Sequence, residues 1–369
     1  MLAEVPRREQ QRASRGPGQP FLISWSLASP TLQTILEETA RCEQRKLDGV
    51  WFPDYEAPLA KWPELYVTLS AIASQTRTLR FGSLITDVVR RHPLVTAHGF
   101  ASLSHMAPGR VILGLGAGAG TTQYPFGISL DHSMSRLAEG IRVIKALWGA
   151  RDGTVDFSGR YFSLKHAQPP MFPLSEVPIY VGSYGPKMLE LTAELADGWL
   201  PESHTPETYA RTLGTIQEKM KSLGRNPDTL HGCCALIFYP WEPDEKAFSR
   251  ILRAAKRYLA DYPDIQWAAG AGKDHPGLRT HQIEQNPELL ESLADKVPDP
   301  LAEATLICGS ASRCYEELAK MREAGCAEAI LEPYWIEKER LLEGVDLAGR
   351  VRSMFVGERA LEGGDRKSR

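Results

Sequence analysis

The chain has 369 residues, of which 43% are hydrophobic and 24% charged, with a net charge of -3. This is the composition of an ordinary globular protein with ample material for a core. A pI near 6.3 with mixed charges excludes the basic stripe of a nucleic-acid-binding protein. The longest apolar runs fall short of the roughly 18 residues that a membrane span needs.

The two ends of the chain are expected to lie outside the main fold. Residues 1–19 lack the apolar segment of a signal peptide, so we expect a disordered leader and a cytoplasmic location. Residues 341–369 are expected to form a C-terminal helix and a disordered tail. The six cysteines form no CxxC pair and no zinc-ligand pattern with histidine. We therefore expect buried thiols, with no disulfide and no metal.

Strand and helix patterns alternate along residues 20–340, which we take as a single domain. Apolar runs of strand length are found at 21–26, 49–53, 79–85, 110–115, 178–182, 198–201, 231–239 and 327–332. Helical spacing is found near 31–45, 64–75, 93–106, 134–149, 186–195, 206–223, 243–261, 285–296 and 311–324. Alternation of this kind predicts a parallel sheet, and its length predicts a (β/α)8 TIM barrel with insertions.

Two stretches are predicted to be excursions from the barrel, near 151–170 and 266–300. The first contains an alternating pattern over 154–164 around Ser158 and Gly159, which is typical of a hairpin. The second contains GAGKDHPG and has poor periodicity before a charged helix. In a barrel enzyme, such insertions cover the opening.

A glycine-rich run, GLGAGAG, follows the predicted strand at 110–115. Gly114, Gly116 and Ala119 match the GxGxxA pattern of dinucleotide-binding proteins. That fold, however, needs a helix to begin at this point, and Pro125 and Gly127 break any helix here. The alternative that we favour is a strand end where bare backbone lies close to a flat ligand.

A second glycine site ends the strand at 178–182. It is followed by Pro186 in the first turn of a helix and by Lys187, a pattern that favours an anion such as the phosphate of a cofactor. The alternative is a tight connection that holds no ligand.

Three motifs carry a family resemblance: TDVVRRHPLVTAHGFASLSHMAPGRVILGLGAG at 86–118, RLAEGIRVIKALW at 136–148 and PIYVGSYGPKMLELTAELADGWLP at 178–201. Together they resemble the bacterial luciferase-like flavin-dependent oxidoreductase superfamily, and within it the members that use the deazaflavin coenzyme F-420. The pattern around RRHP is similar to the methylenetetrahydromethanopterin reductase and phthiodiolone ketoreductase branches. The resemblance implies a luciferase-like barrel that holds the deazaflavin ring across the C-terminal ends of its strands.

The resemblance also implies which residues hold the cofactor. Asp54 matches a family aspartate near the ring, and Ser83 and Leu84 match a third-strand bulge with a non-prolyl cis peptide against the ring's back face. The ring and ribityl chain would be lined by Thr86, Gly116, Ala117 and Gly118. The phosphate would be held by Gly182, Ser183, Tyr184, Gly185 and Lys187.

The chain departs from the sugar-phosphate dehydrogenases of this superfamily. Tyr55, Leu59 and Gln123 stand where those enzymes have a histidine, a tryptophan and a glutamate. Ala119 replaces a further glutamate that is common in relatives. A sugar-phosphate substrate is therefore not expected.

The implied activity is hydride transfer between coenzyme F-420 and a small organic substrate, such as a ketone or alcohol, an imine or an alkene. The candidate catalytic residues are Tyr55, Glu56 and Gln123, followed as proton donors by Glu202, Glu332 and His132. The candidate substrate-pocket residues are Trp25, Trp51, Glu202, Tyr334 and Trp335. His92 is expected to start a helix beside Pro93, and Arg90 and Arg91 to form a solvated or subunit-contact pair.

Two other functions stay open. One is an FMN-dependent luciferase-like monooxygenase that uses molecular oxygen, although the third-strand region and RRHP favour the deazaflavin. The other is a barrel that binds a cofactor without turnover, because the family histidine and glutamate are missing. The expected partner is a second copy of the chain in a homodimer, by analogy with the family, with no nucleic acid and no membrane.

Overall fold

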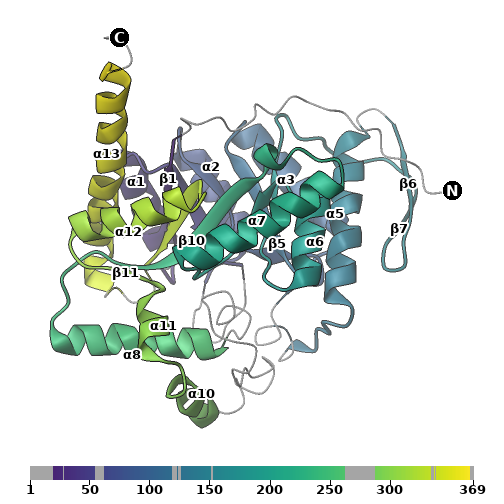
Figure 1. Ribbon diagram of the computed structural model, residues 1–369. Helices are drawn as coiled ribbons and strands as arrows, with labels where there is room; N and C mark the ends of the chain where they lie inside the picture. The colour runs from purple at the N-terminus through teal and green to yellow at the C-terminus, as the bar shows by residue number, and fades with distance from the viewer. Residues whose placement is uncertain are drawn as a thin grey trace.

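The computed structural model describes residues 20–27, 29–54, 62–118, 123, 126–150, 153–261, 287–333, 336 and 338–365. Eight parallel strands close into a barrel, and helices between the strands cover its outside (Figure 1). Around the barrel the strands are β1 (Leu22–Ser26), β2 (Gly49–Phe52), β3 (Arg80–Ser83), β5 (Val111–Gly116), β8 (Ile179–Val181), β9 (Gly198–Trp199), β10 (His231–Tyr239) and β12 (Glu328–Glu332). The prediction of a (β/α)8 TIM barrel, with all eight strands at the expected places, is confirmed.

Two short strands were not predicted. β4 (Thr86–Asp87) continues the course of β3 and pairs with β5, and β11 (Leu306–Cys308) pairs with the last residues of β10. Both have three residues or fewer.

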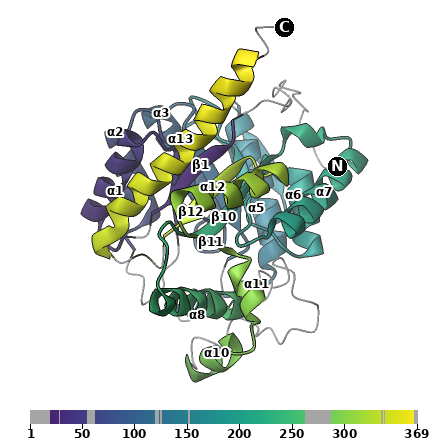
Figure 2. The same ribbon diagram turned by 60° about the vertical axis from the view of Figure 1, so that its left-hand side comes forward.

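The helices that follow the strands form the outer layer. They are α1 (Leu32–Gln44), α2 (Leu65–Gln75), α3 (Pro93–Met106), α5 (Ser133–Gly149), α6 (Pro186–Leu195), α7 (Pro206–Ser222) and α12 (Ala311–Glu323). His92 accepts the N–H of Leu94 at the start of α3, which confirms its predicted role. Residues 341–365 form α13 (Leu341–Asp365), which packs along α1 and α12 (Figure 2).

Two insertions leave the barrel. The first is an antiparallel hairpin of β6 (Val155–Ser158) and β7 (Ser163–Ala167), as the alternation predicted. The second follows β10 and contains α8 (Glu245–Asp261), α10 (Pro287–Ala294) and α11 (Asp299–Glu303), which lie together beyond the barrel (Figures 1 and 2). The segment GAGKDHPG lies outside the described residues. Short 3-10 turns occur at η2 (Pro227–Thr229) and η4 (Lys338–Arg340).

The barrel interior is apolar in its middle. Its side chains form a buried cluster distinct from the larger core between strands and helices. The members are Trp51, Leu84, Ile112, Tyr180, Leu200, Cys233, Ala235 and Ile330. The barrel is therefore packed in the middle and has no open channel along its axis at this level.

A buried carboxylate closes the N-terminal end of the barrel. Glu328 Oε1 accepts hydrogen bonds from Ser24 Oγ at 2.6 Å and Trp51 Nε1 at 3.1 Å. Its Oε2 lies 2.6 Å from the Arg80 guanidinium and 2.9 Å from His231 Nε2. We call these five residues the Glu328 cluster. Oε2 also accepts from the Cys233 thiol at 3.8 Å, so each carboxylate oxygen has at least two partners, as a fully buried charge requires.

The same place has the spacing of a metal site. Ligand atoms of His231, Cys233 and Glu328 lie within 4.8 Å of one another. The guanidinium of Arg80 already neutralises the shared carboxylate. The residues therefore fit an ion pair. A divalent cation bound here would lie next to the positive charge of Arg80, and this repulsion disfavours metal binding.

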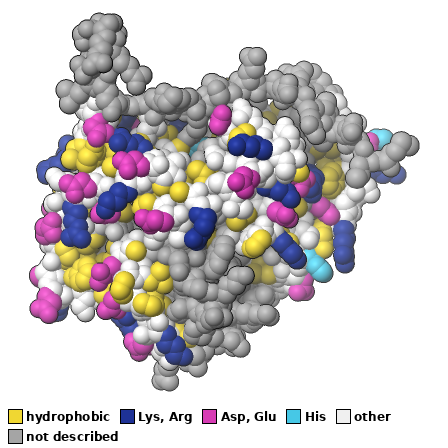
Figure 3. Space-filling view, viewed as in Figure 1, with side chains coloured by type: hydrophobic (Ala, Val, Ile, Leu, Met, Phe, Trp, Pro, Cys, Tyr) yellow, Lys and Arg dark blue, Asp and Glu magenta, His cyan; other side chains and the backbone are white. Residues whose placement is uncertain are grey.

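The surface carries both signs of charge. On the face in Figure 3, Lys and Arg side chains alternate with Asp and Glu side chains over the described helices. Within the described ranges, the helices are too short or too polar to cross a membrane. All six cysteines are free thiols.

Candidate functional site

The C-terminal ends of β2, β3 and β5 bring together several of the predicted cofactor residues. Asp54 follows β2 and is buried, as are Ser83 at the end of β3 and Thr86 in β4. The peptide bond between Leu84 and Ile85, inside the bulge that joins β3 to β4, is cis. Because parallel strands end at one face of a barrel, these residues share the face where barrel enzymes bind ligands.

The bulge lies so close to β5 that two positions of this strand have room only for glycine. A Cβ at Gly114 would lie 2.0 Å from the Ser83 carbonyl oxygen, and a Cβ at Gly116 would lie 2.2 Å from Ile85 Cδ1. The bare backbone was predicted to face a flat ligand, whereas in the structure it faces the bulge. Residues 117 and 118 are not helical, and the next long helix, α5, begins at Ser133. The closed barrel excludes the dinucleotide-binding alternative, which needs an open doubly wound sheet.

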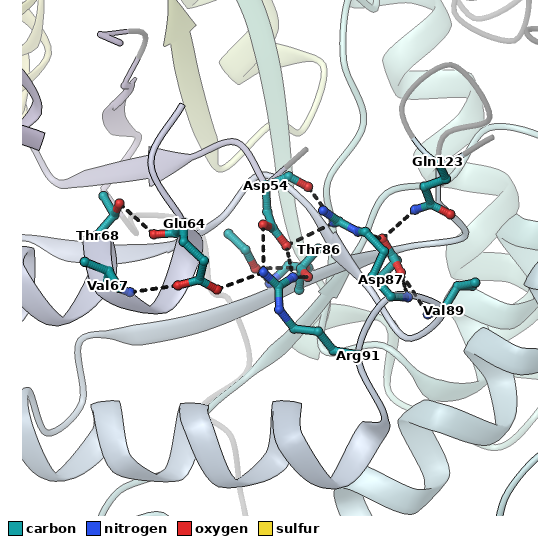
Figure 4. Close-up of polar contacts among 12 residues, drawn as sticks. Asp54, Glu64, Val67, Thr68, Thr86, Asp87, Val89, Arg91 and Gln123 are labelled. Atoms are coloured by element: carbon teal, nitrogen blue, oxygen red, sulfur yellow. Dashed lines mark hydrogen bonds and ion pairs between the residues drawn. The ribbon is translucent and has the colours of Figure 1, made fainter. Parts of the chain in front are cut away.

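Two arginines converge on Asp54 (Figure 4). Arg90 NH2 lies 3.0 Å from Asp54 Oδ2 and 2.6 Å from the Asp54 carbonyl oxygen. Arg91 NH1 lies 2.5 Å from the same Oδ2, and its NH2 lies 2.9 Å from Glu64 Oε1. Burial lowers the pKa of Arg91, but the Asp54 carboxylate outweighs it and the pKa ends above its ordinary value. The arginine side chains are only 7% and 15% exposed. The prediction of a solvated pair is therefore wrong, while a subunit contact stays a prediction.

Asp87 extends this network to Gln123. Its Oδ1 accepts the backbone N–H groups of Val89 and Arg90, and its Oδ2 accepts from Arg90 Nε at 2.6 Å and Gln123 Nε2 at 2.8 Å. Gln123 is buried, and its Oε1 has no hydrogen-bond partner among the described residues. The amide is thus oriented by Asp87 and presents an acceptor that a ligand N–H could satisfy.

The end of β8 supplies a helix N-terminus. Gly185 is the N-cap of α6, Pro186 is its first residue, and no side chain caps its N–H groups. Ser183 Oγ is bonded to Thr192 Oγ1 at 2.8 Å, and the Tyr184 hydroxyl oxygen accepts the Glu202 N–H at 2.8 Å. Backbone N–H groups of this turn and the exposed Lys187 remain for an anion.

Glu202 follows β9 and is held from two sides. The Tyr258 hydroxyl of α8 donates to Glu202 Oε2, while the Glu202 N–H donates to Tyr184. Burial raises the pKa of Glu202, and the hydrogen bond from Tyr258 opposes this rise. Burial and the nearby Glu202 and Glu332 also raise the pKa of Tyr184. The sequence did not indicate a role for Tyr258, because the sequence of an insertion helix does not show which strand end the helix covers.

Other predicted residues lie elsewhere. The indole of Trp25 donates to Glu38 in α1, which places it in the layer between barrel and helices. Trp51 points into the closed interior and bonds Glu328. Neither side chain lies at the opening, because strand alternation turns Trp25 outward and the short β2 keeps Trp51 below the rim. His132 is exposed at the start of α5, beside Tyr161.

Four predicted residues cannot be placed. Tyr55, Glu56, Tyr334 and Trp335 lie outside the described residues. The described part of the site therefore has four components. They are the ion-pair network of Asp54, Arg90, Arg91, Glu64 and Asp87, the amide of Gln123, the start of α6, and the pair of Glu202 and Tyr258.

Comparisons with known proteins agree with this geometry. The chain is 26% identical to 5,10-methylenetetrahydromethanopterin reductase of Methanolobus tindarius over 340 residues, covering 88% of this chain and 97% of that protein. It is 28% identical over 305 residues to phthiodiolone/phenolphthiodiolone dimycocerosates ketoreductase of Mycobacterium bovis, covering 79% and 78% of the two chains. Among solved structures, an F420-dependent secondary alcohol dehydrogenase superposes with a TM-score of 0.75 at 22% identity, covering 90% and 98%.

These relatives are named as reductases and dehydrogenases, so the chain is similar to oxidoreductases over nearly its whole length. The family model described as luciferase-like monooxygenase matches residues 9–328. The match covers well over half of the chain, and the protein therefore belongs to the luciferase-like monooxygenase family.

Proposed function

We propose that this protein is a coenzyme F-420-dependent oxidoreductase that transfers a hydride between the deazaflavin and a small ketone or alcohol, imine or alkene. The observation that carries the proposal is a set of polar groups at the C-terminal end of the barrel that have no side-chain partner in the part of the chain that the structure describes. They are the uncapped N–H groups of α6 and the buried carbonyl of Gln123. The cofactor class is supported by relatives whose names include F420, among them the secondary alcohol dehydrogenase above.

The residues present fit such a cofactor. The start of α6 offers N–H groups and the charge of Lys187 to a phosphate. Gln123 offers a buried acceptor to a ring N–H. Asp54, with its charge balanced by Arg90 and Arg91, would contribute a buried polar group beside the ring. Ser83, Leu84, Thr86, Ala117, Gly118 and Gly182 would complete the lining.

When bound, the deazaflavin supplies a donor or acceptor of hydride in a two-electron step. The protein must then orient the substrate and manage one proton. Glu202 suits the second task, because its raised pKa keeps a proton on the carboxyl group at higher pH than usual. Tyr258 donates to Oε2, which leaves Oε1 to carry that proton toward a developing alkoxide.

The test is a fluorescence titration of the purified protein with coenzyme F-420 and, separately, with FMN. We expect saturable binding of F-420 that is much tighter than that of FMN. Gln123→Leu should weaken F-420 binding, since it removes the acceptor while keeping a similar volume. Ser102→Ala, a change in the outer layer on α3, is the control and should bind normally.

Two results would contradict the proposal. Preferential binding of FMN would favour the oxygen-using monooxygenase, which the name of the matching family model also supports; oxygen consumption with reduced FMN would then decide. Binding of neither cofactor would refute both. Tight F-420 binding without hydride exchange to any ketone, imine or alkene would favour the non-catalytic barrel.

We also infer that two copies associate through barrel helices, as family members do. Analytical ultracentrifugation across a concentration series measures this, and a purely monomeric protein would refute it.

A further inference from the structure

Glu202 faces the inside of the barrel at its C-terminal end. It lies two positions after Leu200, whose side chain belongs to the inner cluster, so strand alternation turns Glu202 to the same side. It pairs with Ala235 of β10, another member of that cluster. The side chain is partly exposed, and no hydrogen bond to its Oε1 is found within the described part of the chain. One oxygen of this inward carboxyl group is therefore not needed by the fold.

The backbone around Glu202 is fixed from two neighbouring strands. The Ala235 N–H donates to the Pro201 carbonyl at 2.9 Å, and the Ser203 N–H donates to the Ala235 carbonyl at 2.8 Å. The Glu202 N–H itself donates to the Tyr184 hydroxyl oxygen at 2.8 Å. The start of the side chain is therefore held in place, and only its own torsions remain to be set.

Those torsions are restrained by Tyr258, which belongs to the insertion and not to the barrel. Its hydroxyl contacts Glu202 Oε2. The same side of α8 carries three buried side chains, Ile251, Ala255 and Leu259. The opposite side forms ion pairs with α10 and α11 through three basic residues, Arg253, Lys256 and Arg257. This packing on both sides of α8 fixes where the Tyr258 hydroxyl lies.

The contact stabilises one protonation state of Glu202 more than the other. An ionised carboxylate can only accept hydrogen bonds, so Tyr258 must then be the donor. Such a bond is charge-assisted and is roughly twice as strong as one between neutral groups. Burial raises the pKa of Glu202, and the hydrogen bond from Tyr258 lowers it. Tyr258 therefore stabilises the charge that remains once Glu202 has released its proton.

We propose that Tyr258 is the positioning residue of Glu202: it orients the carboxyl group inside the barrel opening and stabilises the carboxylate that forms when the proton leaves. This role rests on the proposed function, in which Glu202 protonates the developing alkoxide. In that step the O–H bond of the carboxyl group breaks, the proton bonds to the alkoxide oxygen, and the electron pair of the broken bond stays on the carboxylate.

Four other titratable groups lie around this contact. They are Tyr184 after β8, His204 after β9, Cys234 of β10 and Glu332 of β12. Burial raises the pKa of Tyr184 and of Cys234 and lowers that of His204 to about 3, so all three groups stay neutral near pH 7. The carboxyl groups that an experiment must distinguish here are therefore Glu202 and Glu332.

The test is an infrared titration of the full-length protein that follows the band of protonated carboxyl groups as the pH rises. Glu202→Gln and, separately, Glu332→Gln show which part of the band belongs to Glu202. In Tyr258→Phe we expect the Glu202 band to persist to higher pH than in the wild-type protein, because the hydrogen bond that favours ionisation is gone. The matched control is Tyr315→Phe. It removes a tyrosine hydroxyl that bonds Glu358 between α12 and α13, and it should leave the Glu202 band unchanged.

Coenzyme F-420 binding and the reduction of acetone by reduced F-420 are measured on the same variants. We expect Tyr258→Phe to bind F-420 normally and to reduce acetone roughly 10- to 100-fold more slowly, with its pH profile moved upward. A Glu202 band that titrates identically in Tyr258→Phe and in the wild-type protein would overturn the proposal, whether or not F-420 binds. A shifted band in a protein that does not bind F-420 would refute the proposed function, while still supporting Tyr258 as the residue that sets the charge of Glu202.

Discussion

The two ends of the barrel each hold buried charges, yet they are built differently. At the N-terminal end, both oxygens of Glu328 are saturated by partners from other strands. At the C-terminal end, Asp54 is paired just as closely, but among the described residues Gln123 Oε1 has no hydrogen-bond partner and the first N–H groups of α6 have no side-chain cap.

This difference indicates that the N-terminal end stabilises the fold and that the C-terminal end binds ligands. A buried charge with every partner in place cannot bind anything else, so the Glu328 cluster is a structural plug. A buried acceptor without a partner destabilises the folded protein, and it is tolerated where a bound ligand supplies the missing hydrogen bond. Barrel enzymes in general place stability at the N-terminal face and catalysis at the C-terminal face.

The largest effect is expected from Glu328→Gln. The change leaves the partly exposed Arg80 without its counter-charge and disturbs the buried partners of Glu328, and we expect a loss of about 3 kcal/mol in the free energy of unfolding, the low end of the range for a broken buried pair. Urea denaturation measures it. The double variant with Arg80→Met should lose less than the sum of the single changes, because both charges are then removed. Additive losses would show that the two residues do not act as a pair.

Asp54→Asn should cost less, on the order of 1 to 3 kcal/mol, because Arg90 keeps Asp87 and Arg91 keeps Glu64. The same denaturation series measures it. We further expect coenzyme F-420 binding to weaken in Asp54→Asn, while Glu328→Gln, if folded, binds normally. Equal effects of the two changes on both stability and binding would break the distinction between the two ends.

Glu202 should give the C-terminal end a pH dependence. Its pKa is raised by burial, so the folded protein holds this proton more tightly than the unfolded chain does. Its contribution to stability is therefore complete below the ordinary value of 4.5 and is lost as the pH rises through the raised value. Glu202→Gln should flatten this part of the profile of unfolding free energy against pH. Glu218→Gln removes an exposed carboxylate on α7 and is the control, which should leave the profile unchanged.

The smallest effect is expected from Lys187→Ala. This side chain is exposed, so the free energy of unfolding should change by less than about 0.5 kcal/mol. Coenzyme F-420 affinity should fall by roughly two- to fivefold, and high salt should reduce the difference. Lys221→Ala on α7 is the matched control. A loss independent of salt would argue against a phosphate contact.

Much of the fold was predictable because local patterns carry it. The short apolar runs predicted every barrel strand, and Pro93 with His92 marked the start of α3. The glycines of β5 were noticed but interpreted differently, since a sequence cannot reveal that the bulge at Leu84 and Ile85 fills the space beside them. Arg90 and Arg91 were misjudged because adjacent charges in a loop are usually solvated.

The sequence by itself determined the barrel, its insertions and the family, because hydrophobic period and turn residues act over a few neighbouring positions. Only the tertiary structure decided which charges meet. Arg80 reaches Glu328 across 248 positions and Tyr258 reaches Glu202 across 56. Such pairs depend on strand register and on where an insertion helix packs. Strand register and helix packing produce no periodic pattern in the sequence. The pairs of charged residues at both ends of the barrel are therefore known only from the closed barrel.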